Sequence, residues 1–206
     1  MNRVKKSLLS GAGIVVLGSW ALASSFPFAD NFEGFTNDQP VNGVNGWVAN
    51  EFVVATNMGL GVAPSGAKAV RVGLDSSLSN TYGTVTATNV WADFYVLPRF
   101  YTSAAGEEGP ALMTNASAQF WVDSNGYWRI VGGLAGPPGV TTNVLTLNAL
   151  GGSVAPLASG TWAHVSAFLD YNQKKYAFLV NDVPLAVNQN FITNANTYLT
   201  LFWLYN

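Results

Sequence analysis

The chain has 206 residues, of which 49% are hydrophobic and 13% aromatic but only 10% charged. With 21 glycines, nine prolines and no cysteine, this composition is that of one globular domain and excludes a disordered, collagen-like or disulfide-stapled chain. The formal net charge is −2, so the chain lacks the basic surface that binding of nucleic acid or anionic lipid requires.

The N-terminal segment has the three parts of a secretory signal peptide. Three basic residues among the first six precede an apolar stretch, residues 8–22, and Ala21 and Ala23 supply small residues at the −3 and −1 positions. A membrane-spanning helix needs about 20 apolar residues, and this stretch is shorter and contains three glycines. We therefore predict a cleaved signal peptide at residues 1–23, with a second cut site after Ala29, rather than a retained anchor.

Export places the mature protein in the periplasm, at the cell surface or in the medium, and outside the membrane once the signal is removed. The chain has no cysteine, so neither a thiol-linked lipid nor a disulfide is available, although the compartment would allow disulfides. We expect the hydrophobic core to supply the stability of the domain.

The remainder of the chain predicts strands rather than helices. No stretch keeps apolar residues at helical spacing over three turns, whereas alternation with a period of two recurs. Residues 90–97 alternate between one apolar face and one mixed face, and residues 162–170 place Trp162, His164 and Phe168 on a mixed face opposite small apolar side chains. Such alternation is typical of antiparallel sheets with one face in a core.

Turn residues indicate where strands pair. Residues 120–131 predict a hairpin with the turn sequence Asp-Ser-Asn-Gly, because Asn and Gly tolerate the positive φ of such a turn. Pairing of Val122 with Tyr127 would place Trp121 and Trp128 on the same face.

A three-stranded meander is predicted over residues 169–185. Further expected strands are residues 52–55, 67–73, 83–88, 141–147 and 199–205. About ten short strands separated by loops rich in Gly, Pro and Asn predict a sandwich or barrel.

The residue order also resembles a known family. Residues 30–35, Asp-Asn-Phe-Glu-Gly-Phe, and residues 40–47 look like the opening of secreted bacterial domains of the concanavalin A-like lectin/glucanase superfamily, laminin-G-like jelly rolls included. The resemblance continues over residues 161–182, where a Trp-containing strand leads into an Asp-Tyr turn and a second strand, with Asp182 in place of the usual Gly. It implies an all-β fold, a two-sheet antiparallel jelly-roll sandwich, over residues 30–206.

The same resemblance implies one more strand after residues 199–205, beside the first strand of the domain. The sequence ends at Asn206, and residues 197–205 contain no charge, proline or glycine, so they would leave an apolar strand near a sheet edge. We therefore expect a fragment that lacks its last strand. The alternative is that residues 199–205 pair with residues 30–35 and close a smaller sandwich.

Catalytic motifs are nearly absent from the sequence. The family's glucan hydrolases carry an E-x-D-x-x-E strand, which places nucleophile and acid on one face, and this chain has none. The paired Glu107 and Glu108 lie in a Gly-rich loop, where we expect solvated charges, and His164 has no lyase motif beside it. A G-x-S-x-G elbow, a phosphate loop and a cysteine-based metal site are also missing. We therefore expect a protein without catalytic activity.

Aromatic residues are the strongest functional signal. Seven Trp and eight Tyr permit carbohydrate recognition, because sugar rings stack on flat aromatic faces while polar groups bond the hydroxyls. Trp121 and Trp128 on their predicted shared face, with Arg129 and Asp123 near the turn, are the expected ligand-binding residues. The competing interpretation is that these tryptophans pack in the core.

Calcium is the one cofactor that the resemblance suggests. Jelly rolls of this kind often hold Ca²⁺ near the joined chain ends, where Asp30 and Glu33 are the acidic residues of this chain. The alternative is that both are ordinary surface charges. We predict a secreted, non-catalytic module that binds extracellular polysaccharide or a cell-surface glycan. Two alternatives stay open, namely a polysaccharide hydrolase or lyase with an atypical site and a purely structural or adhesive extracellular protein.

Overall fold

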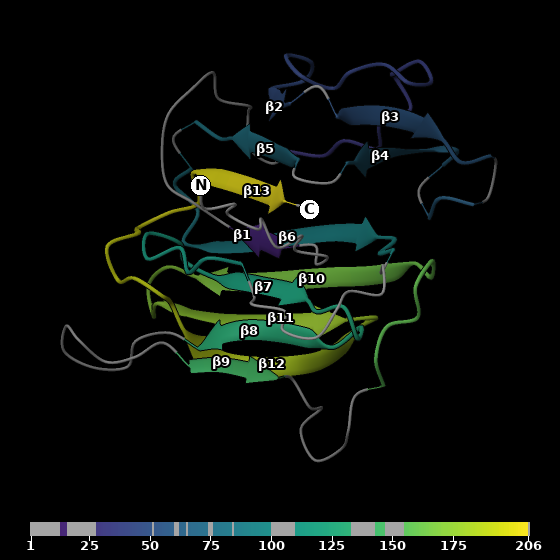
Figure 1. Cartoon of the computed structure of the whole chain (residues 1–206). Helices are drawn as coiled ribbons and strands as arrows, with labels where there is room; N and C mark the ends of the chain where they lie inside the picture. Colours follow the sequence, from purple (N-terminus) through teal and green to yellow (C-terminus); the bar gives the residue numbers. More distant parts are fainter. Residues whose placement is uncertain are drawn as a thin grey trace, which may run out of the picture.

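The computed structural model describes residues 13–15, 28–50, 52–59, 62–64, 66–73, 76–83, 85–99, 110–132, 143–146 and 155–205. Every regular element in these ranges is a strand (Figure 1), so the all-β prediction is confirmed. Within the same ranges no helix has the length and hydropathy that crossing a membrane requires. Most of the predicted signal peptide, and the pair Glu107 and Glu108, lie outside the described residues.

The strands form three antiparallel sheets. The four-stranded sheet has the order β12-β11-β10-β6, with β6 at Asn89–Val96, β10 at Ala163–Asp170, β11 at Lys175–Val180 and β12 at Val183–Asn190. The seven-stranded sheet has the order β2-β5-β13-β1-β7-β8-β9, with β2 at Trp47–Ala49, β5 at Ser77–Thr81, β13 at Leu201–Tyr205, β1 at Gly13–Val15, β7 at Gln119–Val122, β8 at Trp128–Gly132 and β9 at Asn143–Thr146. A two-stranded sheet joins β3 (Val53–Asn57) to β4 (Lys68–Val72).

The main core lies between the four-stranded sheet and the β7–β8 hairpin. Phe178 of β11 packs on Phe120 of β7, with ring centroids 4.5 Å apart. The buried Tyr176 hydroxyl donates a hydrogen bond of 2.9 Å to the carbonyl oxygen of Val131. The two sheets therefore pack face to face as in a sandwich, while the finer jelly-roll topology stays a prediction.

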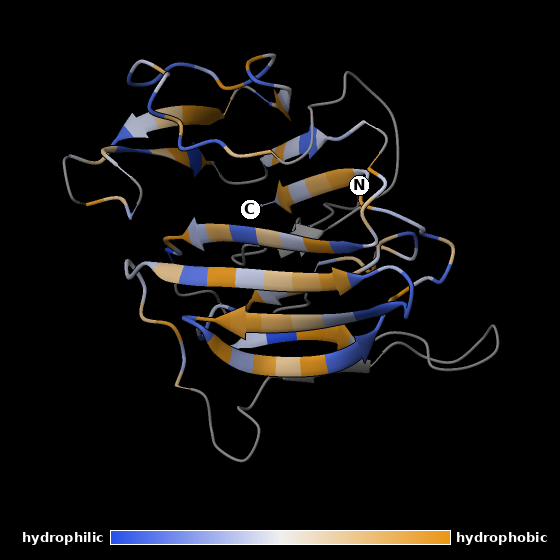
Figure 2. Ribbon diagram, turned by 180° about the vertical axis from the view of Figure 1, so that it is seen from behind, coloured by the Kyte–Doolittle hydropathy of each residue, from blue (hydrophilic) through white to orange (hydrophobic). Residues whose placement is uncertain are grey.

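Side chains alternate along the four-stranded sheet as the sequence predicted. Val165, Ala167 and Leu169 of β10 are fully buried, while His164 and Phe168 between them are partly exposed. Figure 2 shows this sheet in front, with hydrophobic and hydrophilic residues interleaved along its strands. Its outer surface is thus a separate, mixed face.

A second core cluster lies around β2, β3 and β5. Its buried members are Phe35, Val41, Trp47, Val53, Ala55 and Leu78. The expected strand at residues 83–88 is wrong, because the strand in this part of the chain comes earlier, as β5. The alternation of apolar residues does not predict β5, because Asn80 and Thr81 of this strand are polar residues that are buried. Pairing with β2 and β13 holds the strand in place.

Residues 30–35 do not pair with β13. Phe32 has a φ of 62°, and its backbone N–H donates to Asp30 Oδ1 at 2.8 Å, so this segment turns instead of extending. β13 pairs with β5 on one side and with β1 on the other. The alternative in which residues 199–205 close the sheet against residues 30–35 is therefore wrong.

β1 lies inside the segment for which we predict removal as a signal peptide. It pairs antiparallel with both β13 and β7 and joins the two halves of the seven-stranded sheet (Figure 1). Cleavage stays a prediction, and it would remove the shared partner of β7 and β13.

Candidate functional site

The predicted aromatic platform does not exist in the folded chain. Val122 pairs with Trp128, and Trp121 pairs with Arg129, so the predicted pairing of Val122 with Tyr127 is wrong by one residue. Because paired residues share a face of the sheet, Trp121 and Trp128 point to opposite faces. They are 5% and 3% exposed, and neither can offer a ring face to a sugar.

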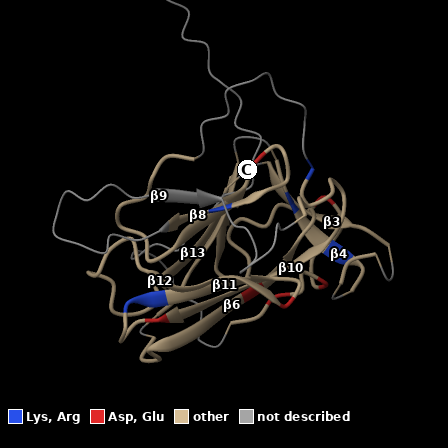
Figure 3. Ribbon diagram, turned by 90° about the horizontal axis from the view of Figure 1, so that it is seen from below, with Lys and Arg blue, Asp and Glu red and all other residues tan. Residues whose placement is uncertain are grey.

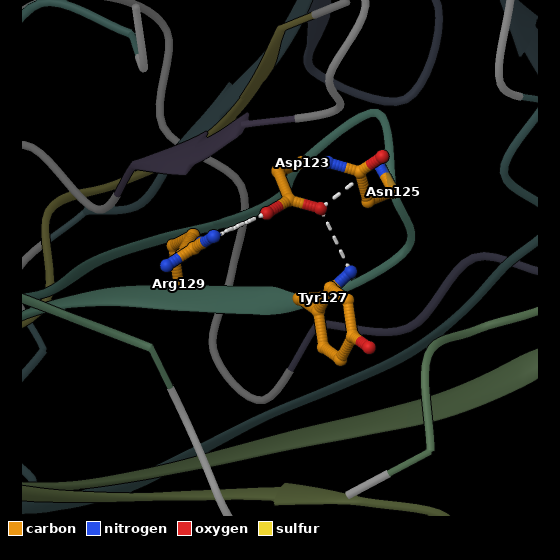
Figure 4. A network of polar contacts seen from close by, with 4 residues as sticks. All are labelled: Asp123, Asn125, Tyr127 and Arg129. Atoms are coloured by element: carbon orange, nitrogen blue, oxygen red, sulfur yellow. Dashed lines mark hydrogen bonds and ion pairs between the residues drawn. The ribbon is translucent and has the colours of Figure 1, made fainter. Parts of the chain in front are cut away.

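Asp123 organises the turn that shifts this register. Its Oδ1 accepts hydrogen bonds from the backbone N–H groups of Asn125 at 3.0 Å and Tyr127 at 2.9 Å. Its Oδ2 accepts from Arg129 Nε at 2.9 Å and Nη2 at 2.7 Å (Figure 4). Tyr127 thereby joins the loop, which becomes one residue longer than predicted. Asp123 bonds to the hairpin backbone and to the guanidinium of Arg129, so both side chains have a structural role in this hairpin.

Asp30 and Glu33, the residues expected to hold calcium, accept hydrogen bonds from neighbouring N–H groups, and the calcium site stays a prediction. Asp30 Oδ2 accepts from Trp47 Nε1 at 2.9 Å, and Glu33 Oε1 accepts from the backbone N–H groups of Ala67 and Lys68, both at 2.7 Å. In the part of the chain that the structure describes, no three or more His, Cys, Asp or Glu residues gather as metal ligands.

A different surface gathers exposed aromatic and polar side chains. Strand β6 is an edge strand of the four-stranded sheet. Its outward side chains Trp91, Asp93 and Tyr95 are exposed, with 57% for Trp91 and 48% for Tyr95. The register with β10 sets them opposite Phe168, Ser166 and His164, respectively. We call these six residues the aromatic face.

Ring contacts order both ends of the aromatic face. At one end, the Trp91 and Phe168 rings lie 5.1 Å apart at 45°. At the other end, Tyr95 stacks on His164 with centroids 4.6 Å apart and an interplanar angle of 21°. These cross-strand pairs reduce the rotamer freedom of Trp91 and Tyr95 and prepare both rings for contact with a ligand.

The polar centre of the aromatic face is built around His164. Its Nε2 lies against Asp93 Oδ1, and its Nδ1 is 3.2 Å from Asp182 Oδ1. Ser166 Oγ donates to the same Asp93 oxygen at 3.0 Å. An imidazolium can donate to both carboxylates, whereas a neutral imidazole has one N–H to give.

The turn between β11 and β12 holds Asp182 beside His164. Asn181 and Asp182 both have positive φ, 49° and 63°, which short polar residues tolerate in tight hairpin turns. The backbone N–H of His164 donates to Asn181 Oδ1 at 2.9 Å, and the backbone N–H of Asn181 donates to the carbonyl oxygen of His164 at 2.8 Å. This reciprocal pair fixes the turn against β10.

The His164 cluster does not have the order of a nucleophile triad. In a Ser-His-Asp triad the histidine stands between the serine and the carboxylate, so that it can take the hydroxyl proton. Here Asp93 stands between Ser166 and His164, and both bond to its Oδ1. Ser166 therefore donates to a carboxylate rather than to a general base that orients it for attack.

Comparisons with known proteins add little to this picture. No family model matches the chain, and no curated protein matches it. Among solved structures it is similar to a protein described as "Sialidase", with 12% sequence identity and a TM-score of 0.42, over 78% of this chain and 12% of that chain. The match spans only a small part of the sialidase chain, and no activity of this protein follows from it. The resemblance to concanavalin A-like domains stays a prediction.

Proposed function

We propose that the protein is a secreted or cell-surface module that binds polysaccharide through the aromatic face, without catalysing a reaction. The observation that carries this proposal is the exposure of Trp91 and Tyr95 on the same side of β6, with Asp93 between them. Large aromatic side chains that stay in solvent on an otherwise core-packed strand are typical of recognition surfaces.

The spacing of the two rings suits an oligosaccharide. Trp91 and Tyr95 are four residues apart on one strand, which corresponds to roughly 13 Å. This span is longer than one sugar ring, so two units of one chain that are separated by at least one other unit can stack on the two rings. The exposed Asp93 between the rings is placed to meet the sugar hydroxyls, and the buried Ser166 holds its carboxylate from below by a hydrogen bond.

Two catalytic alternatives receive less support. A lyase that acts on uronates needs cationic groups to stabilise the charge that develops on the substrate carboxylate, but the groups around His164 and Tyr95 are Asp93 and Asp182. In a hydrolase, two carboxyl groups face the bond that is cleaved. Asp93 and Asp182 instead both contact His164, which lies between them.

Glycan binding of variants tests the proposal. Trp91→Ala and Tyr95→Ala should each weaken binding to the polysaccharide that the protein retains on a glycan array by about five- to tenfold, since one aromatic contact contributes about 1 kcal/mol. Phe52→Ala is the matched control, because Phe52 is 60% exposed but lies next to β3. An array on which no glycan is retained, or equal losses in the control, would contradict the proposal.

A further inference from the structure

We infer that the polysaccharide bound at the aromatic face carries free amino groups, so that its sugar units are cationic. This inference rests on the proposed function and adds the charge class of the ligand. It rests on two observations. The exposed charged groups on the face are acidic, and aromatic and acidic side chains alternate along β6.

The charge on the outer side of β6 and β10 is acidic around the two rings. Asp93 and Asp182 are exposed there, and among the described residues the basic side chain in contact with each of them is the partly buried His164. Lys175 pairs in register with Asp170, six residues along β10 from His164, or roughly 20 Å away. Figure 3 shows the basic residues of this sheet gathered at the start of β11.

Besides Lys175, the position of Arg99 matters for the charge near β6. It is exposed and follows the end of the strand, and the ion pairs of Asp93 and Asp182 do not include it. A ligand that carries carboxylate or sulfate groups would therefore meet two aspartates beside the stacking rings. Like charges at such a contact oppose binding.

An ammonium group fits the alternation of aromatic and acidic side chains. Ammonium donates charge-assisted hydrogen bonds to carboxylates and is attracted to the face of Trp or Tyr rings. Asp93 lies between Trp91 and Tyr95 on the same side of the strand, so one amino group can meet a carboxylate and a ring together. The bonds from His164 and Ser166 both use Asp93 Oδ1, so within the described part of the chain Oδ2 is the acceptor that faces a ligand.

A pair of ligands that differ only in N-acetylation isolates this charge. We would measure binding of a glucosamine oligomer, its fully N-acetylated counterpart of equal length and a uronate oligomer, in buffer that keeps the amines protonated. The wild-type protein is expected to bind the glucosamine oligomer about tenfold more tightly than the acetylated one, with a preference that shrinks as salt is added.

Asparagine substitutions remove charge while keeping shape. Asp93→Asn and Asp182→Asn should each reduce the tenfold preference for the glucosamine oligomer over the acetylated one to less than about twofold. Asparagine at position 93 keeps an oxygen that can accept the hydrogen bond from Ser166. At position 182, asparagine tolerates the positive φ of 63°. Asp38→Asn is the matched control, since Asp38 is exposed at a φ of 60° and changes the net charge equally.

The outcomes separate this inference from the proposed function. Equal affinity for the two glucosamine oligomers, both weakened by Trp91→Ala, would overturn the cationic ligand and keep polysaccharide binding. A preference for the uronate oligomer, or an effect of Asp38→Asn as large as that of Asp93→Asn, would overturn it as well. Binding of none of the three oligomers, together with no retained glycan on the array, would overturn both.

Discussion

Tryptophans of this protein differ in role according to the face of the strand on which they lie. Trp128 packs against Phe178 with centroids 5.0 Å apart, in the cluster that joins the two sheets. Trp91 lies on the outer side of β6 and touches Phe168 at the surface. The same residue type therefore stabilises the core at one position and is available to a ligand at the other.

Alanine substitutions should separate these two roles. Trp128→Ala is expected to lower the free energy of unfolding by about 3–5 kcal/mol, because it leaves a large cavity in the core. Trp91→Ala should lower it by less than about 1 kcal/mol. Denaturant midpoints of the two variants check this contrast. A Trp128→Ala variant as stable as the wild-type protein would show that its indole is not part of the core.

The β7–β8 hairpin shows that a turn can set the register of two strands. Asp123 closes the turn with two backbone N–H groups and one guanidinium. Removing its carboxylate would leave the partly buried Arg129 without this ion-pair partner. One side chain therefore makes several of the bonds that hold this turn.

Substitution of Asp123 tests this dependence. Asp123→Ala should lower the free energy of unfolding by about 1.5–3 kcal/mol, the range for hydrogen bonds to charged groups. Asp123→Asn should cost less, since its amide oxygen still accepts from the backbone N–H groups. The measurement is chemical denaturation of both variants beside the wild-type chain. Identical midpoints for Ala and Asn would mean that the backbone bonds contribute nothing.

Local patterns predicted the strands well and the candidate site poorly. Alternation alone placed Trp91 and Tyr95 opposite the apolar side of their strand, and that assignment is confirmed. Their partners could not be found in this way, because His164 lies 71 residues from Asp93 in sequence and only the pairing of β6 with β10 brings them together. Trp121 and Trp128 were chosen on a register that differed by one residue, and such a shift moves a side chain to the other face.

At the scale of the whole molecule, β1 connects two halves of one sheet. Because it pairs with both β7 and β13, its loss would expose two backbone edges in the middle of the sheet. Exposed strand edges favour pairing with other chains.

Comparison of residues 1–206 with residues 24–206 tests the contribution of β1. The shorter chain should unfold at lower denaturant concentration and self-associate more at high protein concentration. Ile14→Pro in the full chain is the control, because proline removes a strand N–H without shortening the chain. Size-exclusion chromatography and chemical denaturation give both readouts. A shorter chain that stays monomeric with an unchanged midpoint would contradict the role of β1.

Buried tyrosines should limit the stability of the whole fold at high pH. Burial raises the pKa of Tyr82 and of Tyr171 to about 12 and raises the pKa of Tyr176 further. The folded state therefore holds these protons more tightly than the unfolded state, in which tyrosine titrates near pH 10. Their stabilising contribution is complete below about pH 10 and is lost as the pH rises through about 12.

Tyrosinate absorbance during an alkaline titration checks this expectation. Tyr82, Tyr171 and Tyr176 should ionise only at about pH 12 or above, together with loss of the folded state. Ionisation of all eight tyrosines in one step near pH 10, with the fold intact, would contradict the burial.

The central claim is that the aromatic face binds the ligand, and one double variant tests it most directly. Calorimetric titration of the polysaccharide retained by the wild-type protein would be repeated with the variant that combines Trp91→Ala and Tyr95→Ala. Loss of measurable binding, with a melting temperature close to that of the wild-type protein, is the predicted result. Binding of the double variant with wild-type affinity would contradict the account.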